Sequence, residues 1–134
     1  MRSLATLPLR LEKQSQNAQA IAEFLESHKA VKSVNYPGLN SHPEHELARV
    51  QMRYFGPVVS FDLVHRSAAE RFLKASNLLV EATSFGGIVS SAERRARWGH
   101  DAVSEGFIRL SAGCEDLEDL LADLGQALTA SAVE

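Results

Sequence analysis

The chain has 134 residues, of which 45% are hydrophobic, and a formal net charge of −3 at pH 7. This length suits one domain with a substantial core, and the weak acidic balance gives no reason to expect binding to nucleic acid or a membrane surface. The single cysteine, Cys114, excludes an intrachain disulfide and a cysteine-based zinc site. We find no apolar run of spanning length and no signal peptide, so we expect a cytoplasmic protein.

Residues 1–27 are predicted to form one long helix, because apolar residues recur at spacings of three, four and seven. The stripe consists of Leu4, Leu7, Leu11, Ala18, Ile21, Ala22 and Leu25. Pro8 lacks an N–H donor and is expected to kink this helix. Leucines in the early turns occupy more than one side, which predicts that residues 1–27 pack against another subunit or a domain outside this chain.

Shorter elements are predicted in the rest of the chain. Alternating apolar residues predict strands at 30–36, 58–64, 78–82 and 107–112, and a short extended piece at 88–91. Helices are predicted after Ser41, at 68–76 and at 116–128, the first because Ser41 and Glu44 have capping-box spacing. Residues 93–99 are basic and show no period, so we expect a loop. This order predicts an α+β domain with helices on one face of a small, mostly antiparallel sheet.

Arg109 is the strongest candidate for a functional residue. It lies in the last predicted strand between the apolar residues Ile108 and Leu110. An unpaired buried charge is very costly, so Arg109 needs an anionic partner. That partner is either a carboxylate of the protein, with Glu115 and Asp116 nearest in sequence, or a bound anion, because a guanidinium fork suits a carboxylate. The spacing leaves both interpretations open.

Two weaker patterns involve glycine and histidine. The segment Thr83–Gly87 follows a strand and ends in two glycines, which permit close approach of a ligand but are equally explained by a plain turn. It matches neither a phosphate loop nor a dinucleotide fingerprint. His42, Glu44 and His45 have a spacing that suits metal ligands, but the capping box already explains Glu44. We therefore predict no metal site.

Two further patterns are also weak. Arg94, Arg95, Arg97 and Trp98 resemble a nucleic-acid patch, yet the acidic chain disfavours that function and favours an exposed basic loop. Cys114 lies near a predicted helix N-terminus, which can lower a thiol pKa, but no histidine lies near it in sequence.

Several segments, taken together and in order, resemble the C-terminal third of the Cys/Met-metabolism enzymes that use pyridoxal phosphate. That family includes the cystathionine γ-synthases, cystathionine γ- and β-lyases, methionine γ-lyases and sulfhydrylases. The matching segments are Arg2–Leu11, Tyr36–Leu39, Ser41–Pro43 with His45–Ala48, Ser84–Gly87, and Ile108–Gly113 with Glu115–Leu120. Each segment is short, but together they cover almost the whole chain.

The resemblance implies a fold and a role. The family has the aspartate-aminotransferase type of fold, so residues 1–27 would be the inter-domain linking helix and residues 28–134 the C-terminal α+β domain. Arg109 matches the arginine that binds the substrate α-carboxylate. Ser84 matches a serine that lines the active site, and Thr83 precedes it where many γ-acting members carry glutamate. The segment between Gly87 and Gly106 is shorter than usual in the family. Thr83 and this segment both lie where the family selects its substrate, so the resemblance does not decide between elimination and replacement, or between the β and the γ position.

The resemblance also implies what lies outside this chain. The family's Schiff-base lysine and the residues that hold pyridoxal phosphate belong upstream, and none of Lys13, Lys29, Lys32 and Lys74 has the family's sequence context. We therefore expect no catalytic residue, no bound cofactor and no activity in this chain alone. The complete enzyme would bind an amino-acid substrate, and it would either form a homo-oligomer or have its N-terminal cofactor domain packed on residues 1–27. The alternatives are a stand-alone binding or dimerisation module and a gene split into two chains.

Overall fold

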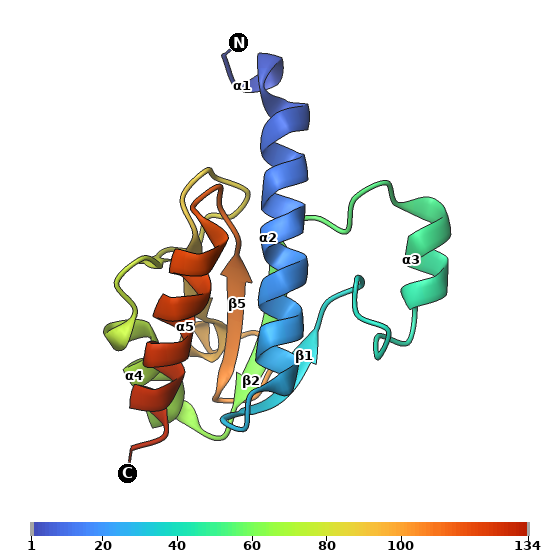
Figure 1. Ribbon diagram of the computed structural model, residues 1–134. Coiled ribbons are helices and arrows are strands. Elements are labelled where there is room, and N and C mark those ends of the chain that lie inside the picture. The colour runs from blue at the N-terminus through green and yellow to red at the C-terminus, as the bar shows by residue number, and fades with distance from the viewer. Residues whose placement is uncertain (1, 134) are drawn as a thin grey trace.

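The computed structural model describes residues 2–133, with side chains from Leu4 onward. The helices are α1 (Arg2–Ala5), α2 (Leu7–Ser27), α3 (His45–Gln51), α4 (Arg66–Ala75), α5 (Leu117–Ser131) and the 3-10 helix η1 (Arg95–Trp98). The strands are β1 (Val31–Asn35), β2 (Val58–Leu63), β3 (Val80–Glu81), β4 (Ser91–Arg94) and β5 (Phe107–Ser111). Figure 1 shows α2 and α5 running across the sheet. The predicted α+β class is confirmed.

The strands form one five-stranded sheet in the order β1-β2-β5-β4-β3. All neighbours are antiparallel except β3 and β4, which are parallel. Apolar residues of the central strands face the helices, and the core there includes Phe61 and Ile108, which are register partners on β2 and β5. Ser60, Glu93, Arg109 and Ser111 occupy the opposite face, which we call the loop face, because side chains alternate along a strand.

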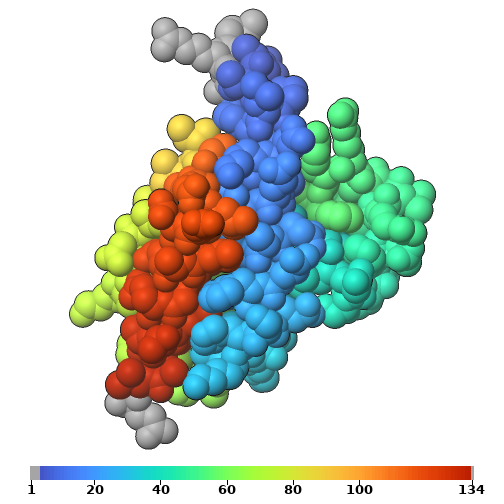
Figure 2. All heavy atoms as spheres, in the orientation of Figure 1, coloured from blue at the N-terminus to red at the C-terminus, as the bar shows by residue number. Residues whose placement is uncertain are grey.

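Helices α2, α4 and α5 cover the core face of the sheet. Phe72 of α4 packs edge to face on Phe61 of β2, with ring centroids 5.5 Å apart. Figure 2 shows α2 and α5 side by side, with the segment 37–57 as a separate lobe beside α2. No helix in residues 2–133 is long and apolar enough to cross a membrane.

The long N-terminal helix has two different halves. Its second half is part of the core, with Ala18, Ile21, Ala22 and Leu25 fully buried. Its first half is exposed, since 66% of Leu4 and 71% of Leu9 are accessible. Pro8 sits in the first turn of α2, where no intrahelical N–H bond is needed, so it separates α1 from α2. The predicted apolar stripe is therefore buried in the core along its second half and exposed at its beginning.

Several local predictions are wrong or only partly correct. The helix after Ser41 begins only at His45 with Glu44 as an N-cap residue that makes no side-chain bond, while Ser41 donates to Glu26. Residues 93–99 form the end of β4 and the helix η1. The strand predicted at 78–82 is present but is shorter, since it pairs only at Val80–Glu81. Of the extended piece predicted at 88–91, only Ser91 belongs to a strand, where it begins β4. In each case tertiary contacts override a short local pattern.

Candidate functional site

Arg109 and Glu93 form an ion pair at the centre of the loop face. They are register partners on the adjacent strands β5 and β4, and Arg109 Nη2 lies 2.6 Å from Glu93 Oε1. Glu93 is completely buried, whereas the Arg109 side chain is 22% accessible. The prediction that Arg109 requires an anionic partner is therefore correct, and the partner within the protein is a residue that the sequence pattern did not single out.

Glu93 is surrounded by nitrogen donors. Its Oε1 accepts from both Arg109 and Arg95 Nη1, the latter at 2.8 Å, and its Oε2 accepts from Trp98 Nε1 at 3.1 Å. Burial alone would raise the pKa of Glu93, but the hydrogen bonds from Arg95 and Trp98 and the charge of Arg109 hold that pKa below the usual value of a glutamate. Glu93 is thus a carboxylate at neutral pH.

The carboxylates proposed as structural partners of Arg109 have other roles. Glu115 accepts from Ser90 N at 2.6 Å and from Ser90 Oγ at 2.8 Å. Asp116 is the N-cap of α5 and accepts from the backbone of Glu118 and Asp119. Both follow the end of β5, so neither reaches the middle of the strand. In the sequence, Glu93 stands out only as the one acidic residue of the arginine-rich stretch 93–99.

The Thr83–Gly87 loop lies against Arg109. The Thr83 carbonyl accepts a hydrogen bond from Arg109 Nη2, and the guanidinium carbon lies 4.9 Å from the centroid of the Phe85 ring. Ser84 is exposed, and its carbonyl accepts from Ser91 Oγ at 3.0 Å. Of the two loop residues predicted for the site, Thr83 contacts Arg109 directly, and Ser84 is the next residue of the same loop.

The position of this loop is fixed by contacts from α2 and β5. Gln14 Nε2 donates to the carbonyl of Gly87 at 2.6 Å and to that of Gly86 at 3.2 Å. The Gly86 N–H donates to Ser111 Oγ at 2.8 Å. Gly86 also has a φ of 84°, a conformation that favours glycine. Gln14 is 2% accessible, and the helical pattern gave no sign of its function.

A second amide of α2 holds the turn that follows β5. Asn17 Nδ2 donates to the carbonyls of Gly113 and Glu115 at 3.0 and 2.9 Å. Gly113 is close to the other loop, because a Cβ there would lie 2.6 Å from Ser90 N. Gln14 and Asn17, on the buried side of α2, therefore hold the two loops that flank Arg109 in place.

Some N–H donors of the Arg109 guanidinium make no hydrogen bond to the described residues. Both of its hydrogen bonds start from Nη2; within residues 2–133, Nε and Nη1 have no hydrogen-bond partner. A guanidinium with one charged and one neutral anchor, partly open to solvent, can take a further carboxylate. The arrangement is suited to binding a carboxylate, because a guanidinium presents several donors and no acceptor.

The other sequence candidates have structural roles. The arginine-rich stretch is neutralised: Arg94 pairs with Glu105 at 2.9 Å and Arg97 with Glu81 at 2.8 Å. His42 Nδ1 accepts from the Glu44 backbone, and no three metal-ligating residues cluster anywhere in the part of the chain that the structure describes. Cys114 is half-buried.

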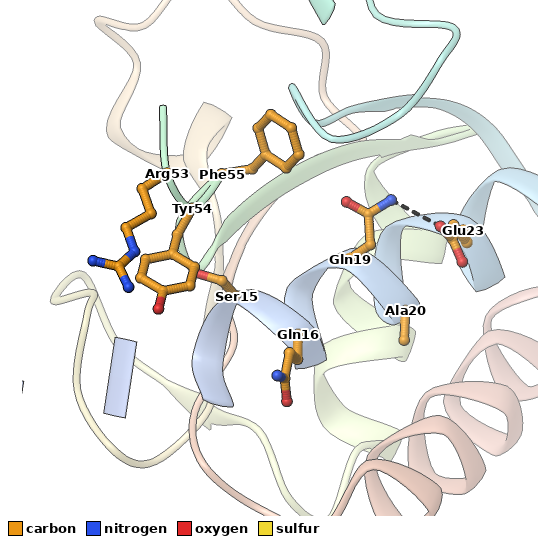
Figure 3. Close-up of a pocket in the computed structure, with 8 residues that line it drawn as sticks. All are labelled: Ser15, Gln16, Gln19, Ala20, Glu23, Arg53, Tyr54 and Phe55. Atoms are coloured by element: carbon orange, nitrogen blue, oxygen red, sulfur yellow. Dashed lines mark hydrogen bonds between the residues drawn. The ribbon is translucent and has the colours of Figure 1, made fainter. Parts of the chain in front are cut away.

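One hollow of the surface adjoins the Thr83–Gly87 loop, and another is lined by none of the residues of this site. One of about 370 Å³ is lined by the 84–91 segment and β3, and Ser84 contributes to it. The other, of about 450 Å³, lies between α2 and the segment 53–55 (Figure 3). Arg53 and Tyr54 stack on one side of it, and Gln19 bonds Glu23 on the other. None of its lining residues bonds Arg109 or Glu93.

The lysines do not fit the cofactor of the family that the sequence resembles. Lys29, Lys32 and Lys74 are exposed, and Lys13 is half-buried on α2. No lysine side chain among the described residues takes part in a hydrogen bond or ion pair, and none lines the hollow to which Ser84 contributes. Among the described residues, no lysine side chain therefore lies against Arg109 or Glu93.

The chain matches one family of proteins in the comparisons with family models, curated proteins and solved structures. The sequence pattern of the family described as Cys/Met metabolism PLP-dependent enzyme covers residues 1–129. A Streptomyces coelicolor protein, provisionally named as a cystathionine γ-lyase, is 54% identical over 95% of this chain and 32% of its own length. The cystathionine γ-lyase of Bacillus subtilis is 43% identical over 96% of this chain and 36% of its own.

The solved structures agree with this assignment. Cystathionine γ-synthase from Xanthomonas oryzae, solved with aminoacrylate and cysteine, superimposes with a TM-score of 0.92 at 38% identity, covering 97% of this chain and 36% of that one. This chain belongs to the Cys/Met-metabolism family of pyridoxal-phosphate-dependent enzymes. It spans about a third of the length of the relatives it matches.

Proposed function

We propose that this chain is the C-terminal domain of a pyridoxal-phosphate-dependent trans-sulfuration enzyme acting on cystathionine or a related sulfur amino acid. Residues 1–27 link it to the cofactor domain, and residues 28–134 form the domain itself. Its task is to bind the substrate α-carboxylate through Arg109, while Thr83 and Ser84 line the same site. The family membership and the coverage of about a third of each relative support this assignment.

The placement of Arg109 carries the proposal. The guanidinium stands on the face of the sheet that the α-helices leave open, is anchored through Nη2 alone, and has Nε and Nη1 free of partners within the described residues 2–133. The Arg109 side chain is 22% accessible, so water can occupy its open donors in the free chain, and a carboxylate can replace that water with charge-assisted hydrogen bonds. An amino-acid carboxylate has the required charge and shape.

The first test measures carboxylate binding at Arg109. In the ¹⁵N-labelled chain, we expect titration with L-cystathionine to shift the Arg109 Nε–Hε resonance more than that of any other arginine. Arg109→Lys should weaken binding by about 10- to 100-fold, because one or two charge-assisted hydrogen bonds are lost. Arg49→Lys is the control, since Arg49 is an exposed arginine on α3 paired only with Glu46. Equal affinity in the Arg109 variant would refute the assignment.

The second test addresses whether this chain acts alone. We expect pyridoxal phosphate, followed by borohydride reduction and peptide mapping, to label the four lysines only weakly and without preference, because none is buried beside Arg109 and Glu93. Labelling of one lysine at a stoichiometry near one, with an absorption band that saturates, would contradict this expectation. It would mean that the chain holds its own cofactor and must be treated as an enzyme.

One observation favours a second candidate function. Leu4, Leu7 and Leu9 are exposed on α1 and the first turn of α2, with 41% to 71% of each accessible. Such a cluster of leucines fits a surface that another protein covers. In a complete enzyme the cofactor domain would cover it, whereas in a stand-alone dimerisation module a second copy of the chain would.

A further inference from the structure

Glu93 is the one fully buried carboxylate in residues 2–133 that contacts Arg109, and it has no role in the function proposed above. It sits opposite Arg109 in the β4–β5 register and accepts from it at 2.6 Å. Its other oxygen is occupied by Trp98 Nε1, and Arg95 shares the first oxygen. Three hydrogen bonds thus fix the orientation of the Glu93 carboxylate, and the bond to Arg109 fixes that guanidinium in turn.

The two N–H groups of Arg109 Nη2 are both in use. One points to Glu93 Oε1 and the other to the Thr83 carbonyl. A carboxylate that binds a guanidinium with two parallel bonds uses Nη2 together with either Nε or Nη1. Such a ligand must therefore displace one of these two partners from Nη2.

The two partners differ in what their displacement costs. Glu93 is charged and 0% accessible, so its release would leave a buried charge with fewer donors, which is strongly unfavourable. The Thr83 carbonyl is neutral and belongs to an exposed residue, so water can replace Arg109 as its donor. The neutral partner is therefore the one that leaves.

We propose that Glu93 is the positioning residue of the carboxylate site, holding Arg109 from behind while the ligand carboxylate replaces the Thr83 carbonyl on Nη2. This inference rests on the proposed function of Arg109 and adds two things to it. It assigns a role to Glu93, and it couples ligand binding to the Thr83–Gly87 loop, because that loop loses its bond to Arg109 when the site fills.

The positioning role is tested without ligand. In the ¹⁵N-labelled chain, we expect Arg109 to give an ordered, slowly exchanging Nε–Hε resonance at neutral pH, and Glu93→Gln to make it mobile and fast-exchanging. Glu81→Gln is the matched control, because it removes the 2.8 Å partner of Arg97 without touching Arg109. A purely structural role would lower the melting temperature of Glu93→Gln but leave the Arg109 side chain ordered, and that result would overturn the inference.

The displacement is tested in the unmodified chain, so it does not depend on a variant that folds. With ¹³C-labelled protein and L-cystathionine, we expect the Thr83 carbonyl resonance to shift as the site saturates, while the Glu93 side-chain carboxyl stays at its position. Glu93→Gln should bind roughly tenfold more weakly, as is typical for the loss of a group that orients a binding residue. A shifting Glu93 carboxyl with a constant Thr83 carbonyl would overturn the inference.

Different results would refute carboxylate binding by Arg109 and the positioning role of Glu93. If L-cystathionine leaves Arg109 of the unmodified chain unperturbed, the assigned function is wrong, although the ligand-free order of Arg109 can still depend on Glu93. If Arg109 responds to the ligand but Glu93→Gln changes neither its order nor the affinity, the function stands and the positioning role is wrong.

Discussion

Replacing Leu25 by alanine is expected to lower the free energy of unfolding by about 3–5 kcal/mol, the range measured for buried leucines that leave a cavity. Leu25 is 0% accessible in the second half of α2, within the same core as Ile21, Phe61 and Leu124. Leu25 is fully enclosed, so its truncation to alanine leaves a cavity that the surrounding helices and strands fill only in part. Urea or thermal unfolding measures the change.

Leu9→Ala is the matched control, because it makes the same chemical change on the same helix. Leu9 is 71% accessible, so its truncation should change stability by less than about 0.5 kcal/mol. A large loss at both positions would show that the first half of α2 is also covered in solution, and no loss at Leu25 would contradict the described core. The pair also separates the part of the proposed linking helix that belongs to the domain core from the part that does not.

Asp123→Ala is expected to cost about 3 kcal/mol, since it removes a buried charged acceptor from several donors at once. Asp123 on α5 accepts from Ser76 Oγ at 2.5 Å, from the backbone N–H groups of Asn77 and Leu78 at 2.9 and 3.0 Å, and from Gln126 at 2.9 Å. These bonds tie the end of α4 to α5. Without the carboxylate, the donors of the 76–78 turn are left unpaired in a site that is 7% accessible at Asp123.

The same residue should make stability depend on pH. Burial raises the pKa of Asp123, but the bonds from Ser76, Asn77, Leu78 and Gln126 outweigh burial and hold that pKa below the usual value. A lowered folded pKa means that this stabilisation is present above the unfolded value of about 3.9 and is lost as the pH falls through the folded pKa. Unfolding curves from pH 7 downward should therefore converge for the wild type and Asp123→Ala at acid pH.

Asp119→Ala is the control for this charge. Asp119 is an exposed aspartate on the same helix, and its carboxylate accepts no hydrogen bond among the described residues. Its removal should cost only the small interaction of a carboxylate with the helix N-terminus, at most about 1 kcal/mol. A parallel pH dependence in wild type and Asp123→Ala would show that Asp123 is not the titrating group.

Hydrophobic spacing predicted most of the elements, and the places where it failed share one cause. The extended piece predicted at 88–91 reaches β4 only at Ser91, because Glu93 and Arg94 are charged yet buried and no apolar alternation marks the strand. The capping box at Ser41 was wrong because turns at 39–45 precede α3, and the Ser41 hydroxyl donates to Glu26 of α2, fifteen residues earlier in the chain. A local pattern cannot include a partner that only the fold brings near.

The sequence by itself determined the fold class, the family and the identity of Arg109 as the residue that requires an anion. These follow from apolar periodicity, from ordered motifs and from the cost of burying a lone charge. Only the tertiary structure decided that Glu93 pairs with Arg109, and that Gln14 and Asn17 hold the flanking loops. These contacts join residues that are 16, 73 and 96 positions apart. The register of β4 on β5 and the seat of α2 on the sheet create these contacts, and neither is encoded in any single segment.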